Sequence, residues 1–256
     1  MSTPAGHSLI SIRGLCRRFG EQVVLDHLDL DIDAGESVVI IGQSGTGKSV
    51  LLKHIIRLLS PDSGQVLIDG QDITDLSFEE LVPIRRKFGM LFQSAALFDS
   101  LTVAENVGLG LKEARHHHPG DIKRIVQEKL DMVGLASAAD KYPSELSGGM
   151  RKRVGMARAI AADPEILLYD EPTTGLDPIT ADVINDLIVA LNQRLHVTSI
   201  AVTHDMTSAF KIADRIVMLY QGRVEFTGTP DEVRSAANPV VQQFIHGRAA
   251  GPIQVR

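Results

Sequence analysis

The sequence predicts an α/β fold in which a run of helices interrupts the alternation of strands and helices. Three observations carry this prediction. Short apolar stretches, such as residues 37–41 and 166–169, are typical of strands buried on both faces of a sheet. A glycine-rich loop at 42–49 joins the first of these strands to an apolar-rich helix. From about residue 94 to 162, helical signals replace the strand signals.

The first half of the chain gives one local pattern for each element. Apolar residues at 28, 30 and 32 alternate with aspartates, which predicts a half-buried strand. A turn at residues 34–36 follows this strand. The Pro-Asp-Ser-Gly turn at residues 61–64 precedes the strand expected at 65–70. The expected elements are strands at 28–33, 37–41, 65–70 and 88–93 and a helix at 50–59.

The second half begins with the helical run and then returns to strands. The segment from Arg215 to Gly228 has Gln221-Gly222 at its centre and predicts a hairpin. The final ten residues have no periodicity and are interpreted as a tail. The expected elements are helices at 101–114, 121–134 and 180–195 and strands at 165–171, 198–205 and 215–228.

Composition narrows the class of protein. The 256 residues suit one large domain or two small ones. A net charge of −6, few aromatic residues and no tryptophan disfavour a nucleic-acid partner. No apolar run approaches the roughly 18 residues that span a bilayer, and the N-terminus lacks a signal-peptide core. Cys16 is the only cysteine, so we expect a cytosolic protein without internal disulfides.

A phosphate-binding loop is predicted at residues 42–49. Its sequence, GQSGTGKS, fits the pattern G-x-x-x-x-G-K-[ST] between a buried strand and a helix. Backbone N–H groups can curl around phosphate oxygens, Lys48 supplies charge for the β- and γ-phosphates, and Ser49 offers a hydroxyl to Mg²⁺. The alternative, a glycine-rich turn with an incidental lysine, does not explain the flanking elements. The predicted binding residues are Gly42, Gln43, Ser44, Gly45, Thr46, Gly47, Lys48 and Ser49.

An acidic pair follows the apolar stretch at 166–169. Asp170 and Glu171 point differently because side chains alternate along a strand. We expect Asp170 to hold Mg²⁺ through water and Glu171 to act as general base on the attacking water, an effect of about 10²–10⁴ in rate. The alternative is a strand that ends in a solvated acidic pair.

Two more polar residues follow predicted strands. His204 lies at a carboxyl end, where α/β proteins form ligand sites, and can hydrogen-bond a γ-phosphate and the attacking water. Gln93 can ligate Mg²⁺ or water through its amide oxygen. Neither residue predicts a site alone, so both predictions depend on the loop and the acidic pair.

These motifs, in this order, resemble the ATP-binding subunit of ABC transporters. The resemblance rests on the phosphate-binding loop, Gln93, LSGGM at 146–150, ILLYDEP at 166–172, GLDP at 175–178 and His204. It covers about residues 9–247 and implies a P-loop NTPase with a RecA-like core, an antiparallel β subdomain and an inserted helical subdomain. It also implies ATP hydrolysis with Mg²⁺. The implied domain spans 7–247, with its core at about 7–93 and 163–247, its helical subdomain at about 94–162, and a tail at 248–256.

The resemblance assigns roles to single residues. Gln93 touches the metal and senses the membrane partner, Asp177 is the D-loop aspartate, and His204 is the switch histidine. Phe19 lies where the family places an aromatic ring, often tyrosine, that stacks on adenine; the alternative is an ordinary core residue at a strand end. The implied catalytic residues are Lys48, Glu171 and His204, and the implied Mg²⁺ ligands are Ser49, Gln93 and Asp170.

Ser147, Gly148 and Gly149 open the signature helix. In the family, this helix caps the γ-phosphate of ATP held by a second, head-to-tail copy, so the resemblance implies a homodimer with two shared sites. The residue types at the start of this helix are consistent with binding an anion, because Ser147 can cap the helix and the first N–H groups of the helix attract an anion. The basic run at 151–153 either adds positive potential or forms a solvated helix face.

A narrower likeness concerns the transported cargo. The blocks at 91–107 and 146–179 and the short GPI tail are similar to the ATPases of MCE-type lipid transporters, including the system that maintains outer-membrane lipid asymmetry. This likeness implies a phospholipid cargo, an integral-membrane permease, an MCE-domain protein, and a peripheral position on the cytoplasmic side of the inner membrane. Met150 departs from the usual signature glutamine, which puts that side chain's hydrogen bond in doubt.

Other interpretations stay open at this stage. Leu97, Phe98, Leu101 and Val103 either line a groove for a permease helix or pack the insert's own core. An ABC ATPase that moves no cargo usually has two ATPase units or a long coiled coil, and this chain has one unit and no sustained heptads. The ATPase of a transporter for another substrate is a further alternative, against which Met150 argues mildly. A binding module without turnover is disfavoured by Glu171 and His204.

Overall fold

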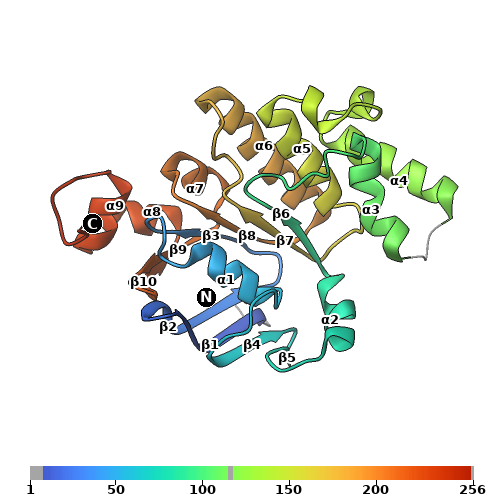
Figure 1. Ribbon diagram of the computed structural model, residues 1–256. Coiled ribbons are helices and arrows are strands. Elements are labelled where there is room, and N and C mark those ends of the chain that lie inside the picture. Colours follow the sequence, from blue (N-terminus) through green and yellow to red (C-terminus); the bar gives the residue numbers. More distant parts are fainter. Residues whose placement is uncertain (1–7, 115–117, 255–256) are drawn as a thin grey trace, which may run out of the picture. The chain divides into compact units, whose positions relative to one another are not determined.

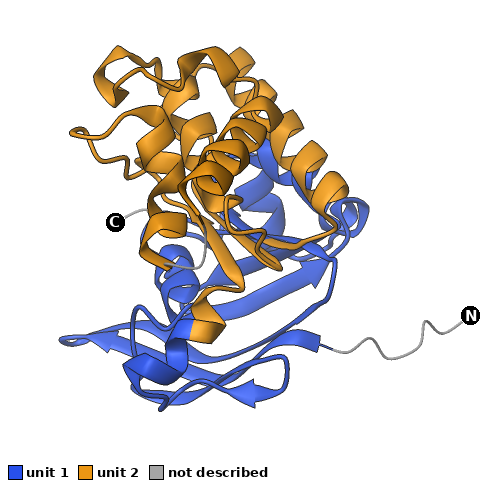
Figure 2. Ribbon diagram, turned by 90° about the vertical axis from the view of Figure 1, so that its right-hand side faces the viewer, with its two compact units in different colours: residues 1–82, 200–256 blue, residues 83–199 orange. Residues whose placement is uncertain are grey.

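The computed structural model describes residues 8–114 and 118–254, which belong to two compact units (Figures 1 and 2). Unit 1 is built from both ends of the chain, up to residue 82 and from residue 200. Unit 2 is the continuous segment 83–199 between them. The boundaries fall inside helix α2 (Phe78–Arg85) and strand β8 (Thr198–Thr203).

Unit 1 contains a four-stranded antiparallel sheet in the order β2-β1-β4-β5. Its longest pairing joins β1 to β2, with Ile12 opposite Leu30. The predicted alternation is present, because Leu28, Leu30 and Ile32 are all buried while the residues between them are not. The strands are β1 (Ser8–Phe19), β2 (Gln22–Asp33), β4 (Ser63–Ile68) and β5 (Gln71–Asp72).

The same unit contains strands β10, β9, β3 and the last four residues of β8, in that order. Strand β3 (Ser37–Ile41) is buried at every position and runs parallel to β9 (Arg215–Tyr220). The predicted hairpin is formed by β9 and β10 (Arg223–Gly228). Glu36 accepts two hydrogen bonds from the Arg215 guanidinium, at 2.6 and 2.7 Å, which fixes the starts of β3 and β9 together.

The helices of unit 1 begin at recognisable caps. Asp205 and Asn238 each accept hydrogen bonds from two backbone N–H groups of the helix that follows, and Thr229 accepts one, from the Glu232 N–H. Proline follows both Thr229 and Asn238 at the first helical position. The three short helices that follow Asp205, Thr229 and Asn238 were not predicted from the sequence. The helices are α1 (Lys48–Ile55), α7 (Met206–Ile212), α8 (Pro230–Ser235) and α9 (Pro239–Ile245).

Unit 2 combines a parallel strand pair with the predicted helical run. Strand β6 (Phe88–Leu91) pairs with β7 (Ile166–Asp170), whose five residues are all buried. The helices are α3 (Val103–Ala114), α4 (Pro119–Met132), α5 (Gly148–Ala159) and α6 (Pro178–Leu195), with 3₁₀ turns η1 (Ala136–Ala138) and η2 (Pro143–Glu145). Val103, Val107 and Leu111 recur on one face of α3 and are buried, so this helix packs the core of unit 2.

Candidate functional site

The phosphate loop, residues 42–49, follows β3 in unit 1, and its last two residues, Lys48 and Ser49, begin α1. Lys48 is only 6% exposed, and its Nζ donates to the carbonyl oxygens of Gly42 at 2.8 Å and Gln43 at 2.9 Å. The Thr46 hydroxyl also donates to the Gln43 carbonyl, at 2.8 Å. The loop thus curls around its own lysine, the arrangement expected of a phosphate cradle.

Glycines fix both ends of the phosphate loop. A Cβ on Gly42 would lie 2.5 Å from the carbonyl oxygen of Leu219 in β9. A Cβ on Gly47 would lie 2.9 Å from the carbonyl oxygen of Val24 in β2, and Gly47 has a φ of +96°, which disfavours any side chain. The loop is therefore shaped by its neighbours in unit 1 before any ligand binds.

Two other predicted residues of unit 1 lie at strand ends. His204 follows β8 directly and is exposed. Phe19 ends β1 and is 44% exposed, with the Arg17 guanidinium carbon 4.7 Å from its ring centre. The ring is therefore not a core residue, which leaves it able to contact a planar ligand.

In unit 2, Asp170 ends the buried strand β7, and Glu171 follows it directly. Their exposed fractions are 7% and 8%. Glu171 has a φ of +48°, a conformation that costs on the order of 1–3 kcal/mol for a non-glycine residue and that gathers at functional sites. The Thr174 hydroxyl donates to Glu171 Oε2 at 2.9 Å. The backbone therefore turns at Glu171, and the Thr174 hydroxyl holds the Glu171 carboxylate.

Lys152 is a site residue that the sequence analysis did not identify. It lies in the basic run at 151–153, yet it is only 5% exposed. Its Nζ donates to the carbonyl oxygen of Gln93 at 2.6 Å and to that of Glu171 at 3.0 Å. Burial lowers the pKa of Lys152 to about 8, although Asp170 and Glu171 oppose this shift. The signature helix α5 thus holds the backbone of both the glutamine and the general-base candidate.

A second cation of α5 reinforces this connection. Arg158 donates to the carbonyl oxygens of Ala95 and Ala96, both at 2.6 Å. Both alanines have positive φ, so the chain after Gln93 bends sharply and depends on these donors. The side chain of Gln93 is exposed.

The signature and D-loop segments meet within unit 2. Ser147 Oγ accepts from the Met150 N–H at 3.2 Å and caps α5. A Cβ on Gly149 would lie 2.6 Å from Thr180 Cγ2 in α6. Asp177 caps α6 by accepting from the N–H groups of Ile179 and Thr180, both at 3.0 Å. Hydrogen bonds from Thr180 lower the pKa of Asp177, so this residue has a structural role besides any role with nucleotide.

The predicted set is divided between the units. Lys48, Ser49 and His204 belong to unit 1, and Gln93, Asp170 and Glu171 belong to unit 2. The candidate metal ligands are a hydroxyl, an amide oxygen and a nearly buried carboxylate, and such hard oxygen donors suit Mg²⁺.

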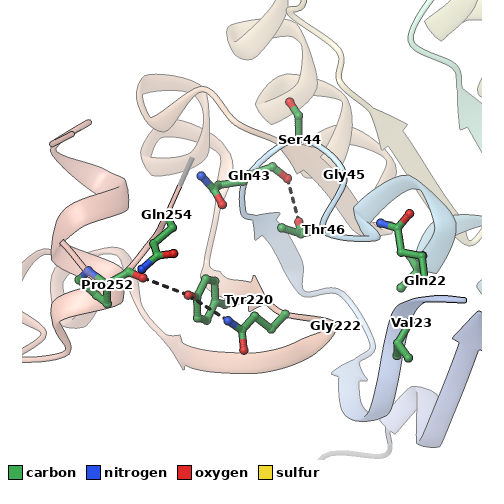
Figure 3. Close-up of a pocket in the computed structure, with 12 residues that line it drawn as sticks. Gln22, Val23, Gln43, Ser44, Gly45, Thr46, Tyr220, Gly222, Pro252 and Gln254 are labelled. Carbon is green, nitrogen blue, oxygen red and sulfur yellow. Dashed lines mark hydrogen bonds between the residues drawn. The ribbon is translucent and has the colours of Figure 1, made fainter. Parts of the chain in front are cut away.

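A pocket of about 840 Å³ adjoins the phosphate loop in unit 1 (Figure 3). Residues 43–46 of the loop, 22–24 of β2 and 220–222 of the β9–β10 hairpin line it, together with Pro252 and Gln254. Its size suits a small organic ligand.

Among the described residues, no helix combines the length and apolarity needed to cross a bilayer.

Comparisons with known proteins agree on one family. A sequence model described as "ABC transporter" matches residues 25–174. The chain is 43% identical over 244 residues to a probable ribonucleotide transport ATP-binding protein, mkl, of Mycobacterium leprae, covering 95% of this chain and 70% of that protein. It is 42% identical to the intermembrane phospholipid transport system ATP-binding protein MlaF of Haemophilus influenzae, covering 97% and 94%.

The sulfate/thiosulfate import ATP-binding protein CysA 2 of Chromobacterium violaceum is 46% identical over 92% of this chain and 63% of its own length. The ATP-binding cassette MJ0796, solved as a dimer in a post-hydrolysis state with ADP and Pi, superposes with a TM-score of 0.79. It is 36% identical and covers 86% of this chain and 98% of its own. This similarity confirms the predicted fold class.

Proposed function

This chain belongs to the ABC transporter family and is an ATPase, and on that premise we propose that it powers phospholipid transport between the inner and outer membranes. In this proposal it acts from the cytoplasmic face of the inner membrane. Its partners are a separate integral-membrane permease and an MCE-domain protein. We also propose that its ATP-binding domain spans 7–247, with a helical subdomain at about 94–162 and a tail at 248–256.

One observation carries the lipid assignment. The MlaF relative, named for intermembrane phospholipid transport, matches along 97% of this chain and 94% of its own length. The sulfate relative has a higher identity, but this chain spans only 63% of it. A match along nearly the whole of both chains favours a shared architecture of the transporter.

The site residues take specific roles in this proposal. The N–H groups of the phosphate loop and Lys48 bind the β- and γ-phosphates, and His204 contacts the γ-phosphate. Glu171 acts as general base on the attacking water. Mg²⁺, held by Ser49, Asp170 and Gln93, would neutralise charge on the phosphates.

We propose that hydrolysis takes place in a head-to-tail homodimer, in which Ser147, Gly148 and Gly149 of one copy close over ATP held by the other. The serine-capped N-terminus of α5 supports this role, since its N–H groups attract anions. Glu171→Gln should retain ATP and dimerise, while Pi release falls by about 10²–10⁴. Light scattering with ATP, and Pi release against wild type, are the measurements. A variant that stays monomeric at every ATP concentration, even beside its permease, contradicts the dimer.

Shared sites can be tested by complementation. Mixing a Ser147→Phe chain with a Lys48→Ala chain should restore one active site in each hybrid pair, since every pair keeps one intact loop opposite one intact signature. No recovery of Pi release, with both chains folded and associated, contradicts shared sites.

A segment of unit 2 presents a candidate surface for the permease. Asn106 is fully buried, and its side chain donates to the carbonyl oxygens of Phe98, Leu101 and Thr102 while its Oδ1 accepts from the Phe98 N–H at 2.8 Å. The buried amide thus fixes loop 98–102 and leaves Phe98 53% exposed. Val103, by contrast, is buried and packs the core, so these two candidates favour different interpretations, while Leu97 and Leu101 are half-buried.

The second candidate cargo is sulfate, favoured by the 46% identity to the CysA relative. Purified complex, reconstituted with its permease in liposomes, separates the two. Phospholipid transfer to acceptor vesicles that needs ATP, with no response of ATPase activity to sulfate, supports the proposal. Sulfate-stimulated hydrolysis without lipid transfer contradicts it.

A further inference from the structure

The segment after α9 folds back onto α9 within unit 1. Gln243 is only 6% exposed, and its side chain pairs with the backbone of Ile253 in both directions. The Ile253 N–H donates to Oε1 at 2.6 Å, and Nε2 donates to the Ile253 carbonyl at 3.0 Å. Nε2 also donates to the Arg248 carbonyl, at 3.1 Å. Ile253 itself is 4% exposed, so the segment 252–254 is docked by paired hydrogen bonds and an apolar anchor.

This docking brings Pro252 and Gln254 into the pocket beside the phosphate loop (Figure 3). The Tyr220 hydroxyl donates to the Pro252 carbonyl at 3.3 Å, which ties the segment to the β9–β10 hairpin. Figure 3 shows Gln254 on the same side of the pocket as Gln43 and Tyr220. The pocket therefore has one wall that comes from the segment 252–254.

The lining of this pocket is electrically neutral. None of its twelve residues carries a charge, and amide side chains are accompanied by valines and a tyrosine. A triphosphate needs cations and backbone N–H groups, which the phosphate loop and Lys48 provide. Uncharged amides and hydroxyls beside valines, a proline and a tyrosine suit the base and ribose, which accept and donate hydrogen bonds without carrying a charge. The phosphate loop, which lines one side of the pocket, therefore suits the phosphates, and the rest of the lining suits a nucleoside.

We propose that residues 252–254 form a wall of the nucleoside end of the ATP site, and that Gln254 hydrogen-bonds the base or ribose of nucleotide bound by the same chain. This inference rests on the ATP site proposed at the phosphate loop. Gln243 is then a positioning residue, since it acts by docking the segment. ATP would contact the docked segment 252–254. Docking of the segment therefore raises the affinity for ATP, and ATP binding stabilises the docked segment by the same factor.

The test compares two probes that share the phosphates but not the nucleoside. ATP and inorganic tripolyphosphate, each with Mg²⁺, are titrated into wild type, Gln254→Ala and Gln243→Leu by calorimetry. Loss of one hydrogen bond predicts ATP binding about 3- to 10-fold weaker in both variants. Tripolyphosphate should bind all three proteins equally. Thermal melts establish that the variants are folded, and Gln254 is exposed, so its truncation leaves the core unchanged.

Two controls make the comparison specific. Gln242→Leu makes the same chemical change one residue earlier on α9, where the side chain donates to Arg234 instead, and should bind ATP like wild type. Lys48→Ala should weaken both probes. Unchanged ATP affinity in Gln254→Ala and Gln243→Leu overturns the inference, as does an equal loss for ATP and tripolyphosphate. A wild-type chain that binds neither probe contradicts the proposed ATP site instead.

Discussion

Lys152 keeps its ammonium group where water hardly reaches it, and its two carbonyl partners give the reason. Lys152 donates to the Gln93 carbonyl and shares the Glu171 carbonyl with the Thr174 N–H, so its removal takes from the backbone at each position a charge-assisted hydrogen bond of about 1.5–3 kcal/mol. Glu171 also has a strained φ that its surroundings must maintain. Lys152 therefore acts as a positioning residue for both.

Lys152→Met should lower kcat for ATP hydrolysis about tenfold or more with KM for ATP little changed, because the phosphate loop is untouched. Steady-state Pi release is the measurement. Arg153→Met, the next residue on α5, is the matched control, since Arg153 donates to the Val133 carbonyl instead, at 3.4 Å. Equal effects of the two substitutions would show that Lys152 has no special role.

The same lysine predicts a pH dependence of stability. Its folded pKa, about 8, lies below the unfolded value of 10.5, so between these values the folded chain binds fewer protons than the unfolded chain. The contribution of Lys152 to the free energy of unfolding should therefore rise from about pH 8 to 10.5 and stay flat below pH 8. Denaturant melts of wild type and Lys152→Met across this range measure it. A constant difference between the two proteins would exclude the shift.

At the scale of elements, α5 and α6 approach closely at one glycine. A Cβ on Gly149 would lie 2.6 Å from Thr180 Cγ2, and the Thr180 hydroxyl is already committed to Asp177 at 2.5 Å. At Gly148 the nearest atom, Leu176 Cδ2, lies 3.2 Å away and belongs to a flexible side chain.

Gly149→Ala should therefore destabilise the protein by about 1–3 kcal/mol, as overpacking does, while Gly148→Ala costs clearly less. Thermal unfolding measures both. Thr180→Ser, which removes the crowded methyl, should restore much of the loss in Gly149→Ala. No recovery in the double variant would place the strain elsewhere.

Elements differ in how well their patterns predicted them. Strands β3, β7 and β8 were predicted because complete burial makes each a short apolar run. The phosphate loop was predicted from the spacing of its glycines, lysine and serine. Strand β1 was missed, since register shifts after Ile12 and around Leu15 break its alternation. Lys152 was missed because it lies between two arginines, and a run of three basic residues is typical of a solvated helix face. Gly149, Lys152 and Met156 share a buried face of α5, and that spacing was the available signal.

For the whole molecule, the proposed permease contact makes one prediction. Phe98→Ala should leave basal ATPase activity unchanged, because Phe98 is exposed and lies outside the proposed catalytic set. Stimulation by the reconstituted permease should fall severalfold, as expected for loss of a buried aromatic anchor. Phe78→Ala, at another exposed phenylalanine, should change neither rate. Full stimulation of Phe98→Ala would remove this residue from the interface.

The division of unit 1 between the two ends of the chain also bears on synthesis. Ser37 and Asp214, joined by a hydrogen bond, are 177 positions apart. A ribosome adding about 5–20 residues per second needs roughly 10–35 s to cover that stretch, while unit 2, being continuous, is complete earlier. The five residues of strand β3 are all buried in the folded protein, and during this time the strand cannot yet pair with β9. Chaperones that shield apolar segments of a nascent chain are therefore expected to act between translation of Ile41 and of Tyr220.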